Sequence, residues 1–403
     1  MIPLENIIQA KKRLNGIVDK TSFAYATALS QTSGAEIYLK KENLQLTGAF
    51  KIRGAYNKIA SLSETEKKNG VVAASAGNHA QGVAFSAKEF GIKAVIVMPE
   101  ATPLLKVVGT KSLGAEVILS GDNYDEACEF ALKYAKEQNM TFIHPFEDIE
   151  VISGQGTIGL EIFDDLNSID TVVVPIGGGG LVVGVASALK QLDPNIKVVG
   201  VGAKGAPAFY ESFKNKKIIN SKNVRTIADG IAVRDVSEFT LKNALDSVDE
   251  VVLVDEEEIA ASILFLLEKQ KLVVEGAGAA GVAAVLHQKF SFYPNEKIGI
   301  VLSGGNIDVQ MLSVIIEKGL VKSYRKMTLM ITLVDKPGAL MRLTDLFRDT
   351  NANIVKIDYD RVSTTVEFGD ANITITLETK GKDHQDLIKT KLSELRYNFS
   401  ILL

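Results

Sequence analysis

Short apolar runs rich in β-branched residues recur along the chain, and helical stretches follow most of them. The runs lie at 70–74, 94–99, 116–119, 171–176, 197–201 and 298–302. Strands that are apolar at successive positions are buried on both faces, and parallel sheets covered by helices bury strands in this way. The pattern therefore predicts an α/β fold with parallel sheets. Ligands of such folds bind at the carboxyl ends of the strands.

A change of sequence texture near residue 325 predicts a second domain. With 403 residues the chain is too long for one ordinary core, so two or three domains are expected. We expect a domain at 1–322 with two α/β subdomains, the smaller at roughly 45–150. After a polar boundary at 322–327, the pattern predicts strand, helix, strand, strand, helix and strand. This order indicates a ferredoxin-like βαββαβ domain at 328–403, with its third strand within 364–379 and its last within 397–403.

Composition excludes several classes of function. The formal net charge is −4 and no long basic run occurs, so a nucleic-acid partner is not expected. The single cysteine, Cys128, forms no disulfide within the chain, and the four histidines are not closely paired, so we predict no metal site. The N-terminus lacks the apolar core of a signal peptide. The uncharged stretch Thr171 to Leu189 contains Pro175 and a run of glycines, which favours strand, loop and helix over a membrane span. We expect a cytoplasmic protein.

Lys51 is the first candidate for chemistry. It lies in TGAFKIRGA, a loop of small residues that runs into a predicted helix. An ammonium loses free energy in apolar surroundings, so its pKa falls and the neutral amine becomes a nucleophile. Such amines condense with aldehydes, and pyridoxal phosphate is the commonest biological partner. Taken alone, the segment is equally compatible with a surface lysine at a helix start.

A second candidate is the glycine loop that joins the strand at 171–176 to a helix. It comprises Gly177, Gly178, Gly179, Gly180 and Leu181. Several backbone N–H groups can point inward in such a loop, and the helix N-terminus favours an anion. The spacing matches neither a Walker loop nor a dinucleotide fingerprint, so a single phosphate monoester fits better. A flexible turn is the alternative.

Two further polar loops follow strands directly. The first comprises Ser75, Ala76, Gly77, Asn78 and His79. Its small residues expose amides suited to a carboxylate, and Asn78 can donate to a phenolate oxygen. For His79 we favour a structural, hydrogen-bonded role. The second loop begins at Ser303, whose neutral hydroxyl could meet a ring nitrogen without stabilising a pyridinium, which favours elimination. By itself this loop is more often a simple turn.

The motifs TGAFKIRGA, SAGNHAQG, GGGGL and SGGN, in this order, resemble those of the fold type II (tryptophan synthase β-like) pyridoxal-phosphate enzymes. The resemblance is closest to the threonine ammonia-lyases and covers about residues 1–320. The tail from Thr328 onward contains DKPGAL and NANI and is similar to an ACT domain, a small amino-acid-sensing module. The resemblance therefore implies a catalytic domain with a regulatory domain after it.

The resemblance also implies a role for each motif. Lys51 would hold pyridoxal 5′-phosphate covalently and act as the base at the substrate Cα. The cofactor would further contact the side chains of Phe50, Asn78 and Ser303 and the backbone of Gly177, Gly178, Gly179, Gly180 and Leu181. The substrate carboxylate would meet Ser75, Ala76, Gly77, Asn78 and His79. The implied reaction removes water from L-threonine and gives 2-oxobutanoate and ammonia.

Two positions refine the implied activity. Serine racemases of this fold carry a serine where Ala76 stands, so racemisation is disfavoured. Some relatives carry an acidic metal ligand where Gly202 stands, so no metal is carried over. An L-serine dehydratase or racemase is the alternative enzyme, because a hydrophobic pocket discriminates one methyl group by only ~1–3 kcal/mol. A non-catalytic amino-acid sensor is the alternative class, which the intact motifs disfavour.

The tail has its own candidate site. Asp335, Pro337, Gly338, Ala339 and Asn353 are the candidate effector residues, because a turn before a helix can hold a carboxylate with its amides. Isoleucine or valine is the expected effector if the enzyme serves isoleucine biosynthesis. A βαββαβ domain exposes a strand edge, so we expect a homo-oligomer, a dimer or tetramer. A tail that only assembles subunits is the alternative.

Overall fold

The computed structural model describes residues 1–363 and 366–402. The chain forms two units, Met1–Ile307 and Asp308–Leu403. Helix α14 (Val309–Lys322) belongs to the second unit, so this division falls at the start of α14, whereas the boundary predicted at 322–327 falls at its end.

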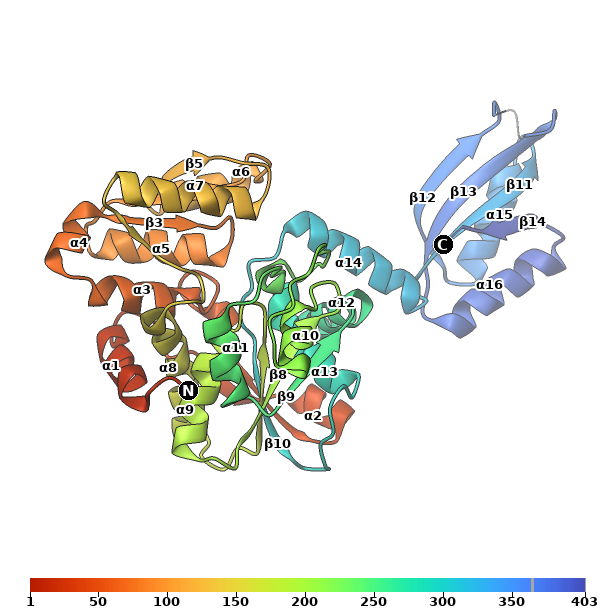
Figure 1. Ribbon diagram of the computed structural model, residues 1–403. Coiled ribbons are helices and arrows are strands. Elements are labelled where there is room, and N and C mark those ends of the chain that lie inside the picture. The colour runs from red at the N-terminus through yellow and green to blue at the C-terminus, as the bar shows by residue number, and fades with distance from the viewer. Residues whose placement is uncertain (364–365, 403) are drawn as a thin grey trace. The chain divides into compact units, whose positions relative to one another are not determined.

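The larger sheet of the first unit has six strands in the order β1-β2-β10-β7-β8-β9 (Figure 1). Only β1 is antiparallel to its neighbour. The strands are β1 (Phe23–Tyr25), β2 (Glu36–Lys40), β7 (Thr171–Pro175), β8 (Lys197–Ala203), β9 (Glu250–Val254) and β10 (Lys297–Val301). Every residue of β7 is buried, which explains its continuous apolar sequence.

The smaller sheet of the first unit has four parallel strands in the order β5-β4-β3-β6. They are β3 (Val71–Ala74), β4 (Ala94–Met98), β5 (Glu116–Leu119) and β6 (Thr141–Phe142). Helices α4 (Glu64–Asn69), α5 (Asn78–Glu89), α6 (Leu104–Ser112) and α7 (Tyr124–Glu137) accompany this sheet. All its residues lie within the predicted smaller subdomain.

The remaining helices of the first unit surround or connect the two sheets. They are α1 (Leu4–Leu14), α2 (Thr27–Ser33), α3 (Lys51–Ser61), α8 (Ile149–Asp165), α9 (Gly180–Leu192), α10 (Ala208–Asn215), α11 (Glu238–Leu245), α12 (Glu256–Phe265) and α13 (Gly276–Leu286). Short helical segments lie at Glu42–Leu44, Asp229–Ile231 and Leu266–Gln270. Helices α8 and α9 pack closely because a Cβ on Gly156 would lie 2.9 Å from the Gly184 carbonyl oxygen.

The six predicted strands are confirmed, but β5 is not buried, because it is the edge strand of its sheet and its ends Glu116 and Leu119 are exposed. The six apolar runs form β3, β4, β5, β7, β8 and β10. The uncharged stretch 171–189 forms strand, loop and helix, as predicted. Within the described ranges, no helix has both the length and the apolar character needed to cross a bilayer.

The second unit contains the predicted βαββαβ order. It comprises β11 (Lys326–Val334), α15 (Ala339–Asp349), β12 (Asn353–Asp360), β13 (Asp370–Glu378), α16 (Lys382–Glu394) and β14 (Asn398–Ile401). The strands form one antiparallel sheet in the order β12-β13-β11-β14. Alternate strand residues such as Ile331 and Ile375 are buried in one core with Phe347 of α15 and Ile388 of α16. Thr364, Thr365 and Leu403, which the predicted third and last strand segments include, lie outside the described residues.

Candidate active site

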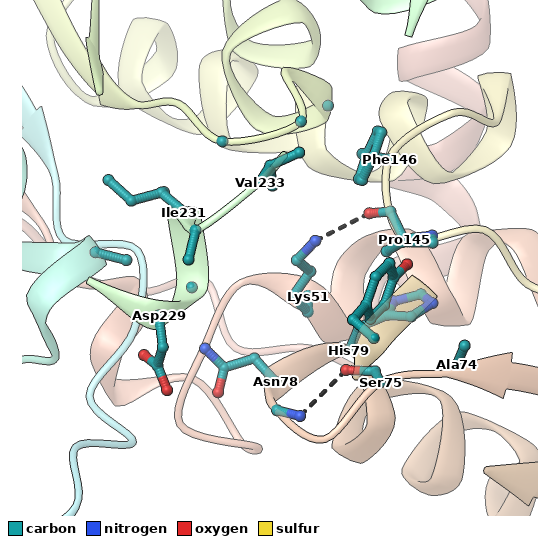
Figure 2. Close-up of a pocket in the computed structure, with 18 of the residues that line it drawn as sticks. Lys51, Ala74, Ser75, Asn78, His79, Pro145, Phe146, Asp229, Ile231 and Val233 are labelled. Atoms are coloured by element: carbon teal, nitrogen blue, oxygen red, sulfur yellow. Dashed lines mark hydrogen bonds between the residues drawn. The ribbon is translucent and has the colours of Figure 1, made fainter. Parts of the chain in front are cut away.

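A cavity of about 820 Å³ in the first unit collects the four sequence motifs (Figure 2). The loops after β3, β7 and β10 line it, so it lies at the carboxyl ends of parallel strands, as the fold predicts. The predicted cofactor and substrate residues all line it: Phe50, Lys51, Ser75, Ala76, Gly77, Asn78, His79, Gly177, Gly178, Gly179, Gly180, Leu181 and Ser303. Segments that are far apart in sequence thus form one site.

Lys51 is the first residue of α3, and its side chain points into the cavity between Val233 and Pro145 (Figure 2). Its Nζ donates a hydrogen bond to the Pro145 carbonyl oxygen at 2.9 Å. Burial lowers the pKa of Lys51 to about 8, and the Glu275 carboxylate opposes this shift. A substantial neutral fraction near pH 8 makes the amine a usable nucleophile and base.

The loop that holds Lys51 is fixed to the end of β10. The Phe50 N–H donates to the Ser303 carbonyl oxygen at 3.1 Å, and Ala49 forms an antiparallel bridge with Gly304. Ser303 is 2% exposed. Two of the four motifs are therefore held together by backbone contacts.

The glycine loop lies at the N-terminus of α9 and has no room for side chains. A Cβ on Gly178 would lie 2.5 Å from the Phe146 ring, and one on Gly179 would lie 2.5 Å from the Phe209 ring. Gly179 also has φ 92°, which favours glycine. The bare backbone at a helix N-terminus suits a phosphate monoester. Together with the Lys51 amine, this cradle fits pyridoxal 5′-phosphate.

Asn78, at the start of α5, has its side-chain amide fixed in one orientation. Its Nδ2 donates to Glu275 Oε1 at 2.8 Å, and its Oδ1 accepts from Asn306 Nδ2 at 2.8 Å. Asn306 Nδ2 also donates to the Thr47 carbonyl oxygen at 2.8 Å. One N–H of Asn78 Nδ2 therefore remains for an acceptor in the cavity.

His79 has the hydrogen bond that we predicted for it. The ring is 3% exposed, and Nε2 lies 2.8 Å from the Ile143 carbonyl oxygen, so Nε2 carries the proton. Burial, together with the charge of Lys51, lowers the pKa of His79 to about 3. The ring is therefore neutral near pH 7. Its role in binding substrate stays a prediction.

Glu275 is a site residue that the motifs did not reveal. It precedes α13, is 4% exposed and lines the cavity. Burial, and then the charge of Asp229, raise its pKa to about 7, although the Asn78 hydrogen bond opposes this. A Cβ on Gly304 would lie 2.4 Å from Glu275 Oε1, so a glycine of SGGN leaves space for the carboxylate. The only sequence signal was a lone glutamate before GAGAAG.

Two ion pairs cross the cavity rim. Lys106 Nζ of α6 lies 3.3 Å from Asp229 Oδ2, and Arg234 lies 2.9 Å from Asp125 Oδ2 of α7. The four side chains line the cavity and are partly exposed. Exposed pairs contribute about 0–1 kcal/mol each, so these two pairs hold the lining segments together only weakly.

The predicted effector residues lie in the second unit. Gly338, with φ 84°, precedes α15, so the turn does end at a helix N-terminus. Asp335 Oδ1 accepts a hydrogen bond from the Tyr359 hydroxyl at 2.8 Å. Asn353 pairs across the sheet with Glu378, as Lys326 does, whereas Val334 pairs with Asp370 at the other end of the sheet. Within one chain, Asn353 is therefore far from the turn.

No group of three or more His, Cys, Asp and Glu side chains suitable for a metal ion occurs among residues 1–363 and 366–402. Gly202, the position at which the resemblance led us to carry over no metal ligand, lies within β8. The absence of a metal stays a prediction.

Comparison with known proteins agrees with this geometry. The pyridoxal-phosphate dependent enzyme family matches residues 14–304. The chain is 50% identical over 402 residues to an L-threonine ammonia-lyase of Thermotoga maritima, covering 100% of both proteins. A second L-threonine ammonia-lyase, from Geobacter sulfurreducens, is 44% identical over the same length. The catabolic L-threonine dehydratase of Escherichia coli is 44% identical over 313 residues, which are 77% of this chain and 95% of that protein.

Solved structures show the same fold. Threonine deaminase isoform 2 from Solanum lycopersicum gives a TM-score of 0.75 at 37% identity, covering 78% of this chain and 87% of that one. Maize serine racemase gives a TM-score of 0.74 at 37% identity, covering 80% of this chain and 98% of that one. Overall architecture therefore does not separate deaminase from racemase, and the site residues must decide.

Proposed function

This chain belongs to the pyridoxal-phosphate dependent enzymes, and we propose that it converts L-threonine to 2-oxobutanoate and ammonia by eliminating water. Its cofactor is pyridoxal 5′-phosphate. The observation that carries the proposal is one cavity that is lined by the Lys51 amine, the glycine loop at 177–181 and the polar loop at 75–79. The full-length similarity to two L-threonine ammonia-lyases supports the substrate.

Each part of the cofactor has a partner in the cavity. Lys51 would hold its aldehyde carbon, and the backbone of 177–181 would hold its phosphate. The free N–H of Asn78 would meet its phenolate oxygen, Phe50 would pack beside its ring, and the Ser303 hydroxyl would meet its ring nitrogen. When bound, the cofactor withdraws electrons from the substrate Cα and makes the Cα–H bond acidic.

The chain's own groups complete the elimination. The amides of Ser75, Ala76, Gly77, Asn78 and His79 hold the substrate carboxylate. Lys51 Nζ, with a pKa of about 8, takes the Cα proton and returns it to the departing Cβ hydroxyl, which leaves as water. Hydrolysis of the resulting enamine adds one water and releases ammonia, so threonine gives 2-oxobutanoate and ammonia with no net consumption of water.

Ala76 favours elimination over racemisation. Reprotonation of Cα on the opposite face requires an acid there, and the methyl group of Ala76 cannot supply a proton. L-Serine differs from threonine by one methyl group, so we expect slower turnover of serine. A steady-state assay with L-threonine and L-serine, followed by chiral chromatography, tests this. Racemisation faster than deamination would identify a serine racemase, and serine turned over faster than threonine would identify a serine dehydratase.

We propose that the second unit is an ACT domain that regulates a cytoplasmic, biosynthetic lyase. The turn containing Asp335, Pro337, Gly338 and Ala339 would hold the carboxylate of isoleucine or valine. Asn353 would join this site only through a second copy, because it lies at the other end of its own sheet. The Escherichia coli dehydratase matches only 77% of this chain, which supports a catalytic unit that does not need the remainder for its chemistry.

The same unit is our candidate for assembly. Strands β12 and β14 are the edges of its sheet, and a second copy can pair with either edge, giving a homo-dimer or tetramer. Light scattering with and without isoleucine measures the assembly, and steady-state kinetics measures the regulation. A non-catalytic sensor would bind the amino acid but deaminate no threonine.

A further inference from the structure

Gln155 is a buried polar side chain of the cavity that no part of the proposed mechanism uses. It lies on α8, is 1% exposed and lines the cavity. Its Oε1 and Nε2 have no hydrogen-bond partner among the described residues. A buried amide without partners costs roughly 1–3 kcal/mol. Native folds contain few buried polar groups without hydrogen-bond partners, so we expect this amide to bind a partner from outside the chain.

Neighbouring glycines determine where the amide lies. A Cβ on Gly54 would lie 2.3 Å from Gln155 Nε2, so only the absence of a side chain at Gly54 leaves room for the amide against α3. A Cβ on Gly184 would lie 3.2 Å from the Gln155 carbonyl carbon, so the same residue packs against α9. Gln155 therefore lies between α3, near which its side-chain amide lies at Gly54, and α9, near which its backbone lies at Gly184.

These two helices both begin at the cavity, α3 at Lys51 and α9 at Gly180. The positive ends of two helix dipoles therefore face the cavity that Gln155 also lines, and this potential favours an anion over a cation or a neutral group. The Gln155 amide adds two N–H donors to that environment. Of the groups on the cofactor, the phosphate is the one that matches.

We propose that Gln155 Nε2 donates a hydrogen bond to the phosphate of the bound cofactor, in addition to the backbone amides of the glycine loop. The inference rests on the proposed cofactor site. It makes Gln155 a phosphate-binding side chain, and it explains why a polar residue occupies a buried position between glycines of α3 and α9.

The test compares two ligands in the full-length, cofactor-free protein. Q155M keeps a long, unbranched side chain and removes both donor and acceptor. We expect the dissociation constant for pyridoxal 5′-phosphate to rise about 10- to 100-fold, the range for a hydrogen bond to a charged group. The dissociation constant for pyridoxal, which lacks the phosphate, should stay unchanged. The melting temperature without cofactor should stay the same or rise, because an unpartnered amide has been removed.

A buried glutamine of the second unit provides the control. Gln385 is 7% exposed, and its Nε2 donates to the Lys326 carbonyl oxygen at 3.2 Å and to Thr379 Oγ1 at 3.1 Å. Q385M should lower the melting temperature and leave both dissociation constants unchanged. Q155E keeps the shape of the side chain and adds a negative charge. It should raise the dissociation constant for pyridoxal 5′-phosphate more than Q155M does. It also serves if Q155M does not fold.

The outcomes separate the claims. If the dissociation constants for pyridoxal 5′-phosphate and pyridoxal rise equally, the contact lies elsewhere on the cofactor and the phosphate assignment is wrong. Unchanged affinity for pyridoxal 5′-phosphate would mean that the amide is solvated by buried water only, which also overturns it. Wild-type protein that binds no pyridoxal 5′-phosphate would overturn the proposed function together with this contact.

Discussion

Two buried titratable residues of the cavity have pKa values that burial shifts toward each other. Burial lowers the pKa of Lys51 to about 8 and raises that of Glu275 to about 7. In both cases loss of hydration disfavours the charged form, and the charge of Glu275 limits the shift of Lys51. Both groups therefore change charge near neutral pH, where proton transfer is most efficient.

Replacing Lys51 by alanine should abolish the covalent attachment of the cofactor and the base at Cα. We expect protein without the yellow colour of bound cofactor and turnover reduced by at least ~100-fold, measured by absorbance and by 2-oxobutanoate formation. Lys58→Ala on the same helix is the control, because Lys58 Nζ pairs with Asp148 at 2.7 Å and does not line the cavity. Undiminished turnover in Lys51→Ala would refute the assignment.

Glu275 should make the stability of the cofactor-free protein depend on pH. Folding raises its pKa from 4.5 to about 7. Below pH 4.5 the carboxyl is neutral in both states, and its burial carries no charge penalty. As the pH rises toward 7, the unfolded chain loses this proton before the native state does, so the native state is destabilised by on the order of 3 kcal/mol.

Glu275→Gln removes that titration. The melting temperature of the variant, relative to wild type, should therefore increase between pH 4.5 and pH 7.5. Gln keeps one carbonyl oxygen that can accept from Asn78 but replaces the other oxygen by an amide donor, so the comparison is between pH values and not between absolute stabilities. Parallel melting curves over this range would show that Glu275 titrates normally.

Sequence patterns identify a site residue when its chemistry is visible in its own segment. Lys51 stands out because Gly, Ala and Phe surround it in the sequence. The environment of Glu275 is made by Asn78, Asp229 and Gly304, which lie far from it along the chain. Neither its burial nor its raised pKa could be predicted before those segments were brought together.

At the scale of elements, the glycine loop combines two separate requirements. Gly179 has φ 92°, and a Cβ there would meet the Phe209 ring at 2.5 Å. Gly34 has φ 79°, but a Cβ there would meet no other atom within 4 Å. The two glycines share the backbone requirement and differ in the available space.

Gly179→Ala and Gly34→Ala therefore separate the two effects. Both should lose about 1 kcal/mol of stability because a side chain is introduced at positive φ, and Gly179→Ala should lose more because its Cβ meets the Phe209 ring. Only Gly179→Ala should also displace the loop from the phosphate and raise the dissociation constant for pyridoxal 5′-phosphate, measured by absorbance titration. Equal cofactor affinity in the two variants would mean that the loop does not bind the phosphate.

The elements that the sequence patterns missed have physical reasons. Strands β1 and β6 comprise 3 and 2 residues, too few for a periodicity to be recognised. Strand β2 contains Lys40, which reads as a surface residue but is 0% exposed. Its Nζ donates to Glu161 at 2.5 Å, a partner on α8 that the local sequence cannot reveal. Strand β7 was recognised from its continuous apolar sequence alone, whereas β9, which is apolar from Val251 to Val254, was not among the predicted runs.

At the scale of the whole molecule, the chemistry and the proposed regulation lie in different units. Every residue that lines the cavity lies between Phe50 and Asn306, within the first unit. The order of elements in the second unit was predictable because its strands alternate buried and exposed residues, as in β13. The separation of Asn353 from the turn at Asp335 was not, because it depends on strand register.

Truncation after Ile307, where the second unit begins, should leave a lyase that binds cofactor and deaminates threonine but no longer responds to isoleucine or valine. A second truncation after Lys322 keeps α14 and tests whether this helix supports the first unit. In the full-length protein, linkage requires that isoleucine changes the affinity for a threonine analogue by the same factor as the analogue changes the affinity for isoleucine. Calorimetric titration of each ligand, with and without the other, measures both factors. If isoleucine and valine change neither the threonine kinetics nor the melting temperature of the full-length protein, assembly is the only role left for the second unit. A ligand that binds two conformational states equally shifts the equilibrium between them toward neither.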